Sequence, residues 1–240
     1  MKKIITAIAF IALSTVSAKA IELPSLGMFS VTAGLATNTG VYGATGVQTN
    51  EDGAAGTFRT NKDSGVFVDG HSSQFIELGV GEWFSVGYEH TPDSISTPTA
   101  TAREGSQAGA ETNVTVDFND LNTTYIKVNL PFIPGVYARY GTVETDLDIK
   151  ESMSSGSTYK NVSTSGEIMG LGYSRFFGES GLAIRFEGAY LQLDNVKTTN
   201  GIAKGTVDIG SGSVNFNEVE AKNMEGLQGK IALTYTLGRN

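Results

Sequence analysis

The chain repeats one pattern of apolar and polar positions. Between Leu182 and Leu193, the apolar residues Ile184 and Phe186 share one parity, while Arg185 and Glu187 share the other. Side chains alternate between the two faces of a β-strand, so a period of two predicts a strand that lies between two different environments.

Seven further stretches show the same alternation, which makes eight predicted strands: 29–36, 75–80, 84–89, 125–130, 136–141, 169–174, 182–193 and 228–237. The predicted connections run over about 38–72, 81–83, 91–120, 131–135, 148–163, 177–181 and 194–224. Long and short connections therefore alternate along the chain. This arrangement favours an all-β fold, an eight-stranded antiparallel up-and-down transmembrane β-barrel with short periplasmic turns and long extracellular loops. A secreted soluble β-sandwich is the alternative fold.

Aromatic residues cluster at the three short turns. They are Trp83, Phe84, Phe132, Phe176 and Phe177. Aromatic side chains gather at the two interfaces of transmembrane barrels. We therefore expect these five residues to form the periplasmic aromatic girdle.

The first twenty residues have the features of a secretory signal. Lys2 and Lys3 precede an apolar run, and Ala18-Lys19-Ala20 has the small-x-small form of a cleavage site. The prediction is a cleaved signal peptide over 1–20 and one barrel domain over 21–240. Without residues 1–20 the chain has 14 basic and 25 acidic residues, a net charge of −11. So acidic a chain disfavours nucleic acid as a partner.

Several charged residues share the parity of Arg185 and Glu187. Setting arginine at the lipid midplane costs roughly 2–4 kcal/mol, so these side chains are expected to face the lumen. The predicted lumen charge network consists of Glu77, Glu89, Lys127, Arg139, Arg185, Glu187 and Lys230. An eight-stranded barrel is just wide enough for side chains to fill it, so we expect a structural plug and not a catalytic or transport site. A 131–135 turn centred on Ile133 would set Lys127 opposite Arg139.

Taken together, the N-terminal signal, the eight alternating strands and the alternating connection lengths resemble the small eight-stranded bacterial outer-membrane barrels. This group is typified by the barrel domain of outer-membrane protein A and by outer-membrane protein X. The last alternating strand, GKIALTYTL, is typical of the group, although the chain ends in Leu237-Gly238-Arg239-Asn240 and not in an aromatic residue. The resemblance implies an outer-membrane location, contact with lipid and lipopolysaccharide, and insertion by the barrel assembly machinery. A monomer is expected.

Catalytic chemistry finds little support in the sequence. The two histidines are His71, in a predicted loop, and His90, at a strand end beside Glu89, whose side chain points to the other face. The chain contains no cysteine and no recognisable metal or phosphate motif, so we expect neither an enzyme nor a cofactor.

The predicted function is a structural role in the envelope, together with surface interaction through the loops 38–72, 91–120, 148–163 and 194–224. The alternatives are a narrow pore or small-solute transport barrel and, less favoured, a lipid-modifying enzyme. In the last loop, residues 206–217 read as a hairpin with Ser211-Gly212 at its tip. Such a ribbon would project from the membrane, and its free edge would accept a partner by strand addition. A similar extension is expected around 147–149.

Overall fold

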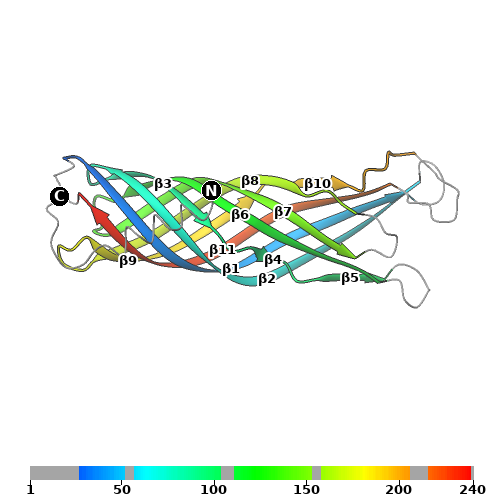
Figure 1. The fold of residues 1–240 in the computed structure, drawn as a ribbon, viewed down its shortest axis with the longest axis horizontal. Helices are drawn as coiled ribbons and strands as arrows, with labels where there is room; N and C mark the ends of the chain where they lie inside the picture. The colour runs from blue at the N-terminus through cyan, green and yellow to red at the C-terminus, as the bar shows by residue number, and fades with distance from the viewer. Residues whose placement is uncertain (1–26, 52–56, 104–110, 153–157, 206–215, 239–240) are drawn as a thin grey trace.

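Eight antiparallel strands close into a barrel in the computed structural model, which describes residues 27–51, 57–103, 111–152, 158–205 and 216–238 (Figure 1). The strands of the ring are β1 (Phe29–Glu51), β2 (Phe58–Val80), β3 (Phe84–Thr91), β6 (Glu111–Asn129), β7 (Val136–Ser152), β8 (Val162–Phe176), β9 (Leu182–Leu193) and β11 (Asn217–Leu237). The ring closes because β1 pairs with both β2 and β11. The predicted fold class, an eight-stranded antiparallel barrel, is confirmed.

Three short strands add to this ring. The strands β4 (Ile95–Ser96) and β5 (Ala100–Arg103) pair with β6, and β10 (Val196–Thr199) pairs with β11. In the described residues, no helix has the length and apolar character needed to cross a membrane.

The strand register makes the barrel narrow. A row of paired residues that starts at Val31 passes once around the ring and returns to β1 at Val41, ten positions further along. The row consists of Val31, Leu78, Val86, Ile126, Tyr140, Met169, Tyr190, Leu227 and Val41. Strand number and stagger together set barrel diameter, and a ring of eight leaves an interior that side chains can fill.

The strands are much longer than the sequence pattern indicated. Where loops were predicted over 38–72 and 91–120, β1 runs on to Glu51, β2 begins at Phe58, and β6 begins at Glu111. Over 148–163 and 194–224, β7 continues to Ser152 and β11 begins at Asn217. Those four loop boundaries were therefore wrong. The distal part of β2, residues 58–66, is exposed on both faces and has no need of an apolar face, so the period-two signal ends before that strand does.

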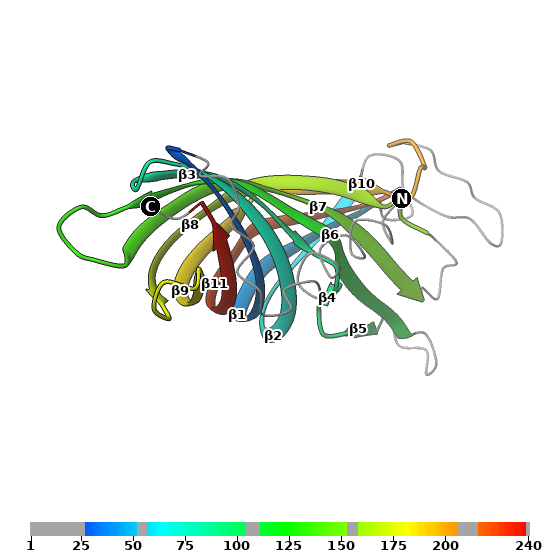
Figure 2. The ribbon, with the colours of Figure 1, turned by 60° about the vertical axis from the view of Figure 1, so that its left-hand side comes forward.

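These extensions make the molecule elongated, with the short turns at one end and the strand extensions at the other (Figures 1 and 2). We call these ends the short-turn end and the long-loop end. The extension expected around 147–149 is present, since Leu147 pairs with both Phe118 and Val162. The predicted hairpin tip at Ser211-Gly212 and the signal peptide lie outside the described residues.

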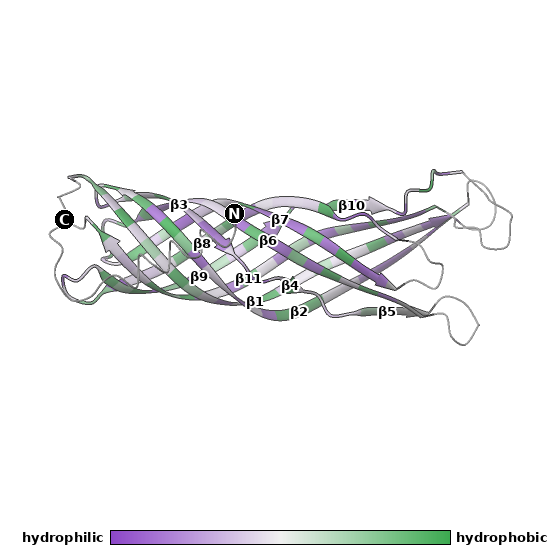
Figure 3. Cartoon of the chain, in the orientation of Figure 1, coloured by the Kyte–Doolittle hydropathy of each residue, from purple (hydrophilic) through white to green (hydrophobic). Residues whose placement is uncertain are grey.

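Outward and inward faces differ in the way that the alternation predicts. Large apolar side chains stand exposed on the outer wall of the barrel, including Leu35, Ile76, Val86, Phe186 and Leu233. Hydrophobic and hydrophilic residues alternate along the strands at the short-turn end (Figure 3). The outer wall thus forms an apolar belt, the surface that a transmembrane barrel presents to lipid.

The interior has two layers. Charged side chains fill the layer that lies inside the apolar belt. Toward the long-loop end, the buried cluster is apolar and includes Tyr42, Val143, Ile168, Leu191 and Met224. In that part of the molecule the two sides of the sheet enclose an ordinary hydrophobic core.

Candidate functional site

The seven residues of the predicted lumen network all lie inside the barrel. They come from six strands, β2, β3, β6, β7, β9 and β11, and each is at most 8% exposed. Lys127 is paired directly with Arg139, in the register expected from a turn centred on Ile133. Like charges in such a pair repel, so each cation needs a carboxylate nearby.

Glu77 supplies one of these carboxylates. Arg185 donates to it through both terminal nitrogens, at 2.6 and 2.8 Å. Lys127 Nζ donates to Glu77 Oε2 at 2.5 Å, and the Tyr125 hydroxyl donates to Oε1 at 3.0 Å. The two-pronged contact with arginine is the strong form of a charge-assisted hydrogen bond.

Arg139 connects the other two carboxylates. Its Nη1 donates to Glu89 Oε2 at 2.5 Å, and its Nη2 lies 2.7 Å from Glu187 Oε1. Lys230 Nζ donates to Glu89 at 2.6 Å and lies 3.8 Å from Glu187. All four cations therefore contact at least one carboxylate, and the seven side chains bridge the lumen from wall to wall.

Three aromatic rings complete this layer, and the predicted site did not include them. The Tyr137 hydroxyl donates to Glu187 at 3.0 Å, and the guanidinium of Arg139 lies 4.8 Å from the centre of the Tyr125 ring. Arg185 lies 5.5 Å from the centre of the Phe75 ring. A sequence signal for these rings exists, because each aromatic residue precedes a network charge by two positions: Phe75 and Glu77, Tyr125 and Lys127, Tyr137 and Arg139.

Glycines make room for all three rings, because a Cβ atom on Gly172 would lie 2.3 Å from Cζ of Tyr137. A Cβ atom on Gly87 would lie 2.3 Å from Cζ of Tyr125, and one on Gly34 would lie 2.2 Å from Cζ of Phe75. Any larger residue at one of these positions would push the ring out of the lumen. The glycine content of the chain thus has a packing function inside the barrel.

The cavity on the long-loop side of the network is small. A cavity of about 20 Å³ lies between the charged layer and the apolar cluster, where Asn38, His71 and Gln228 meet Val143 and Ile168. This volume is enough for about one water molecule. Among the described residues, no group of three or more histidine or acidic side chains is placed to hold a metal ion.

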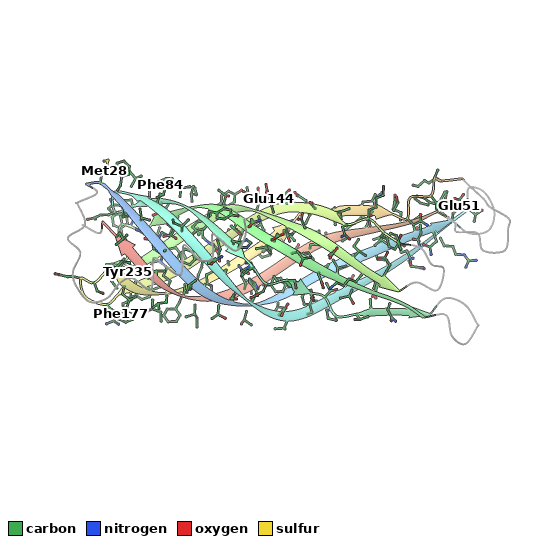
Figure 4. All side chains as sticks on the ribbon, viewed as in Figure 1. Met28, Glu51, Phe84, Glu144, Phe177 and Tyr235 are labelled. Atoms are coloured by element: carbon green, nitrogen blue, oxygen red, sulfur yellow. The ribbon has the colours of Figure 1, made fainter. Side chains whose placement is uncertain are left out.

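Most of the predicted girdle residues stand exposed at the short-turn end. Trp83, Phe84, Phe132 and Phe177 are all among the exposed large apolar side chains, and Phe132 is 93% exposed. Phe84 and Phe177 lie at the same end of the molecule as Met28 and Tyr235, with Glu51 at the opposite end (Figure 4). Phe176, the last residue of β8, is partly exposed.

The two histidines lie on opposite faces of the barrel wall. His71 lies within β2, where it pairs with Asn38, so its placement in a loop was wrong. Its side chain is buried in the lumen beside the small cavity. His90 is on the outer face, and its Nδ1 lies 2.7 Å from Asn122 Oδ1. The two rings therefore belong to different environments.

Comparison with known proteins gives a fold match without a family match. No family model matches the chain, and no curated protein matches it. Among solved structures, the outer membrane protein OprG from Pseudomonas aeruginosa is 11% identical, with a TM-score of 0.51, and the alignment covers 86% of this chain and 96% of that one.

Two further matches have lower scores. The outer membrane protein AlkL is 12% identical over 92% of this chain and 97% of its own, with a TM-score of 0.43. Ail of Yersinia pestis is 7% identical over 84% of this chain and 99% of its own, with a TM-score of 0.33. At these identities the comparison with OprG bears on fold alone. The chain has the fold of a small outer-membrane β-barrel.

Proposed function

We propose that this protein is an integral barrel of the bacterial outer membrane that does not conduct. In this proposal its role in the envelope is structural, and its long-loop end interacts with other molecules outside the cell. The apolar belt with aromatic residues at the short-turn end supports membrane insertion. Lipid and lipopolysaccharide would then surround the belt, and the barrel assembly machinery would insert the chain.

One observation gives the main support for a lumen that is closed to solutes. Glu77, Glu89 and Glu187 each contact at least two donors or cations from other strands, so a solute crossing this layer would have to separate buried ion pairs. Leaving one partner of a buried pair uncompensated is expensive, by about 3–5 kcal/mol. The network therefore supports a plug more strongly than it supports a pore. The same closed packing supports a role without catalysis.

Planar-bilayer recording tests this proposal. Purified protein, shown to be folded by its heat-modifiable migration on a gel, should give no discrete channels at concentrations where a known porin conducts. The known porin, added afterwards to the same bilayer, serves as the check that insertion is detectable under these conditions. Regular single-channel steps from the unmodified protein would support the transport alternative instead.

A further inference from the structure

The strand β2 has a free edge beyond the membrane belt. From Phe58 to Ser73 it is paired with β1 along its whole length, whereas its pairing with β3 begins only at Gln74. In the described part of the chain, no strand pairs with the other edge of this segment. Unpaired strand edges are templates for pairing with another chain.

The alternation of an antiparallel ladder shows which groups point to this edge. Gly81 N–H donates to Met28 O at 2.7 Å, and the β1–β2 register continues from there without a shift. Odd-numbered residues of β2 therefore bond to β1, and even-numbered residues direct their N–H and C=O groups toward the free edge. The N–H of Ser72 agrees with this assignment, since it donates to Asp93 Oδ2 at 3.2 Å and not to β1.

Carboxylates accept the edge-facing N–H groups of β2 on both sides of a short segment, Val66–Val68, which we call the window. Asp93 takes the N–H of Ser72, and Asp69 Oδ1 accepts the N–H of Gly70 at 2.7 Å. On the other side, Asp63 Oδ1 accepts the N–H of Ser64 at 2.8 Å. Between these caps lie Val66 and Val68, and no side chain among the described residues caps their edge-facing backbone groups in this way.

The side chains of the window are exposed and apolar. Val66 is 73% and Val68 is 67% exposed. Val68 continues a paired row through Val41 to Leu227, both of which are also exposed. Along β1 and β2 themselves, the polar outward residues Thr37, Thr39, Ser72 and Gln74 lie between this row and Leu35 and Ile76 of the apolar belt. Across the ladder, the row continues from Leu227 to Tyr190 and Met169. A patch that combines exposed valines with open backbone groups differs from a lipid-facing surface, because acyl chains offer no hydrogen bonds.

We infer that the β2 edge at Val66–Val68 is a strand-addition site for an extended peptide of a partner protein, one with apolar residues at alternate positions and basic residues on either side. The backbone of such a peptide would pair with Val66 and Val68, and its apolar side chains would extend the row from Leu227 and Val41. Basic flanking residues would meet Asp63 and Asp69. This inference rests on the proposed interactive role of the long-loop end.

The test uses the full-length barrel in detergent micelles and the synthetic peptide acetyl-KVTVTTK-amide, with acetyl-EVTVTTE-amide as its charge-reversed control. Backbone amide exchange is followed by nuclear magnetic resonance. At saturating basic peptide, the amides of Val66 and Val68 should exchange at least about ten times more slowly. The acidic peptide should protect them less.

Proline substitutions separate the edge from the fold. Val66→Pro removes an N–H that faces the free edge, together with the exposed valine side chain, and leaves the groups that bond to β1 in place. The β1 ladder and heat-modifiable migration should therefore persist while peptide binding is lost. Thr60→Pro, also an even-numbered position of β2 but outside the window, should bind as the unmodified protein does. Binding that survives Val66→Pro, or a basic peptide that gives no protection at Val66 and Val68, would overturn the inference.

The same exchange measurement would also detect two other molecules bound at this edge. Protection without peptide that rises with protein concentration would assign the edge to a second copy of the chain. Protection that appears only when lipopolysaccharide is added to the micelles would assign it to lipid. Either result contradicts a peptide site. Neither depends on channel activity, so the inference and the closed-lumen proposal fail independently.

Discussion

At the scale of single residues, the barrel interior is organised by charge compensation. Four cations share three carboxylates, and the pairing is specific: Glu77 holds Arg185 and Lys127, while Glu89 holds Arg139 and Lys230. Removing one carboxylate leaves its cations close together in a space that water does not readily reach. The neutral tyrosine and phenylalanine rings beside them cannot replace the missing charge.

Glu77→Gln is therefore expected to destabilise the barrel by about 3–5 kcal/mol, because two buried cations lose their counter-charge. The temperature at which the folded gel band disappears measures this loss. Glu82→Gln, the same change in the exposed turn after β2, should leave that temperature unchanged. Adding Lys127→Met to Glu77→Gln should recover part of the loss, since it removes one unpaired cation. Equal stability of Glu77→Gln and the unmodified protein would show that the network is not structural.

At the scale of elements, a side chain bonds to the edge of β2 just beyond the end of its pairing with β3. The Ser72 hydroxyl donates to Asp93 Oδ2 at 2.5 Å, and the Ser72 N–H donates to the same oxygen. These bonds tie the segment after β3 to the edge of β2.

The tie should depend on pH. Hydrogen bonds from the Ser72 side chain and backbone hold the pKa of Asp93 below its usual value of 3.8. A lowered pKa means that the stabilisation is complete above 3.8 and is lost as the pH falls through the lowered value. Below that pH the Ser72 amide should lose its hydrogen bond to Asp93. Its exchange rate, measured by nuclear magnetic resonance, should then exceed the rate of an amide whose hydrogen bond persists at the same pH. In Asp93→Asn this extra acceleration should disappear, and its persistence would contradict the assignment.

At the scale of the whole molecule, two cores lie in series. The charged layer occupies the part enclosed by the apolar belt, and the cluster around Val143 and Leu191 occupies the long-loop side. The ring register from Val31 to Val41 is complete without the distal halves of β1 and β2. The transmembrane part should therefore fold without that extension.

Replacing residues 44–64 with a four-residue turn tests this division. The shortened protein should keep its heat-modifiable migration, because the ring and all seven network residues are retained. It should also lose binding of the basic peptide, since Val66 would then lie at the tip of a turn. Failure to form the compact gel band would show that the extension is needed for the barrel itself.

The sequence predicted the transmembrane half of the fold well and the other half poorly. Near Ile184 and Phe186 the strand separates lipid from a polar lumen, and because of this contrast apolar and polar residues alternate in the sequence. Around Thr60 or Thr115 both faces meet water or neighbouring polar chains, so nothing in the order of residues distinguishes strand from loop. The rings of Phe75, Tyr125 and Tyr137 were missed for another reason. An inward aromatic residue has the same parity whether it contacts the charged network or packs on other residues of the lumen, so parity alone does not identify it.

What the sequence determined by itself was the number of strands in the ring, their alternation and the side on which each network charge lies, since burying arginine in lipid is so costly that parity alone decides. Only the tertiary structure decided which carboxylate serves which cation, because partners such as Glu77 and Arg185 are 108 residues apart and meet through the stagger of the whole ring. It also decided where an edge is left open, at Val66 and Val68, because an unpaired edge is a property of neighbours in space and leaves no pattern in the strand that carries it.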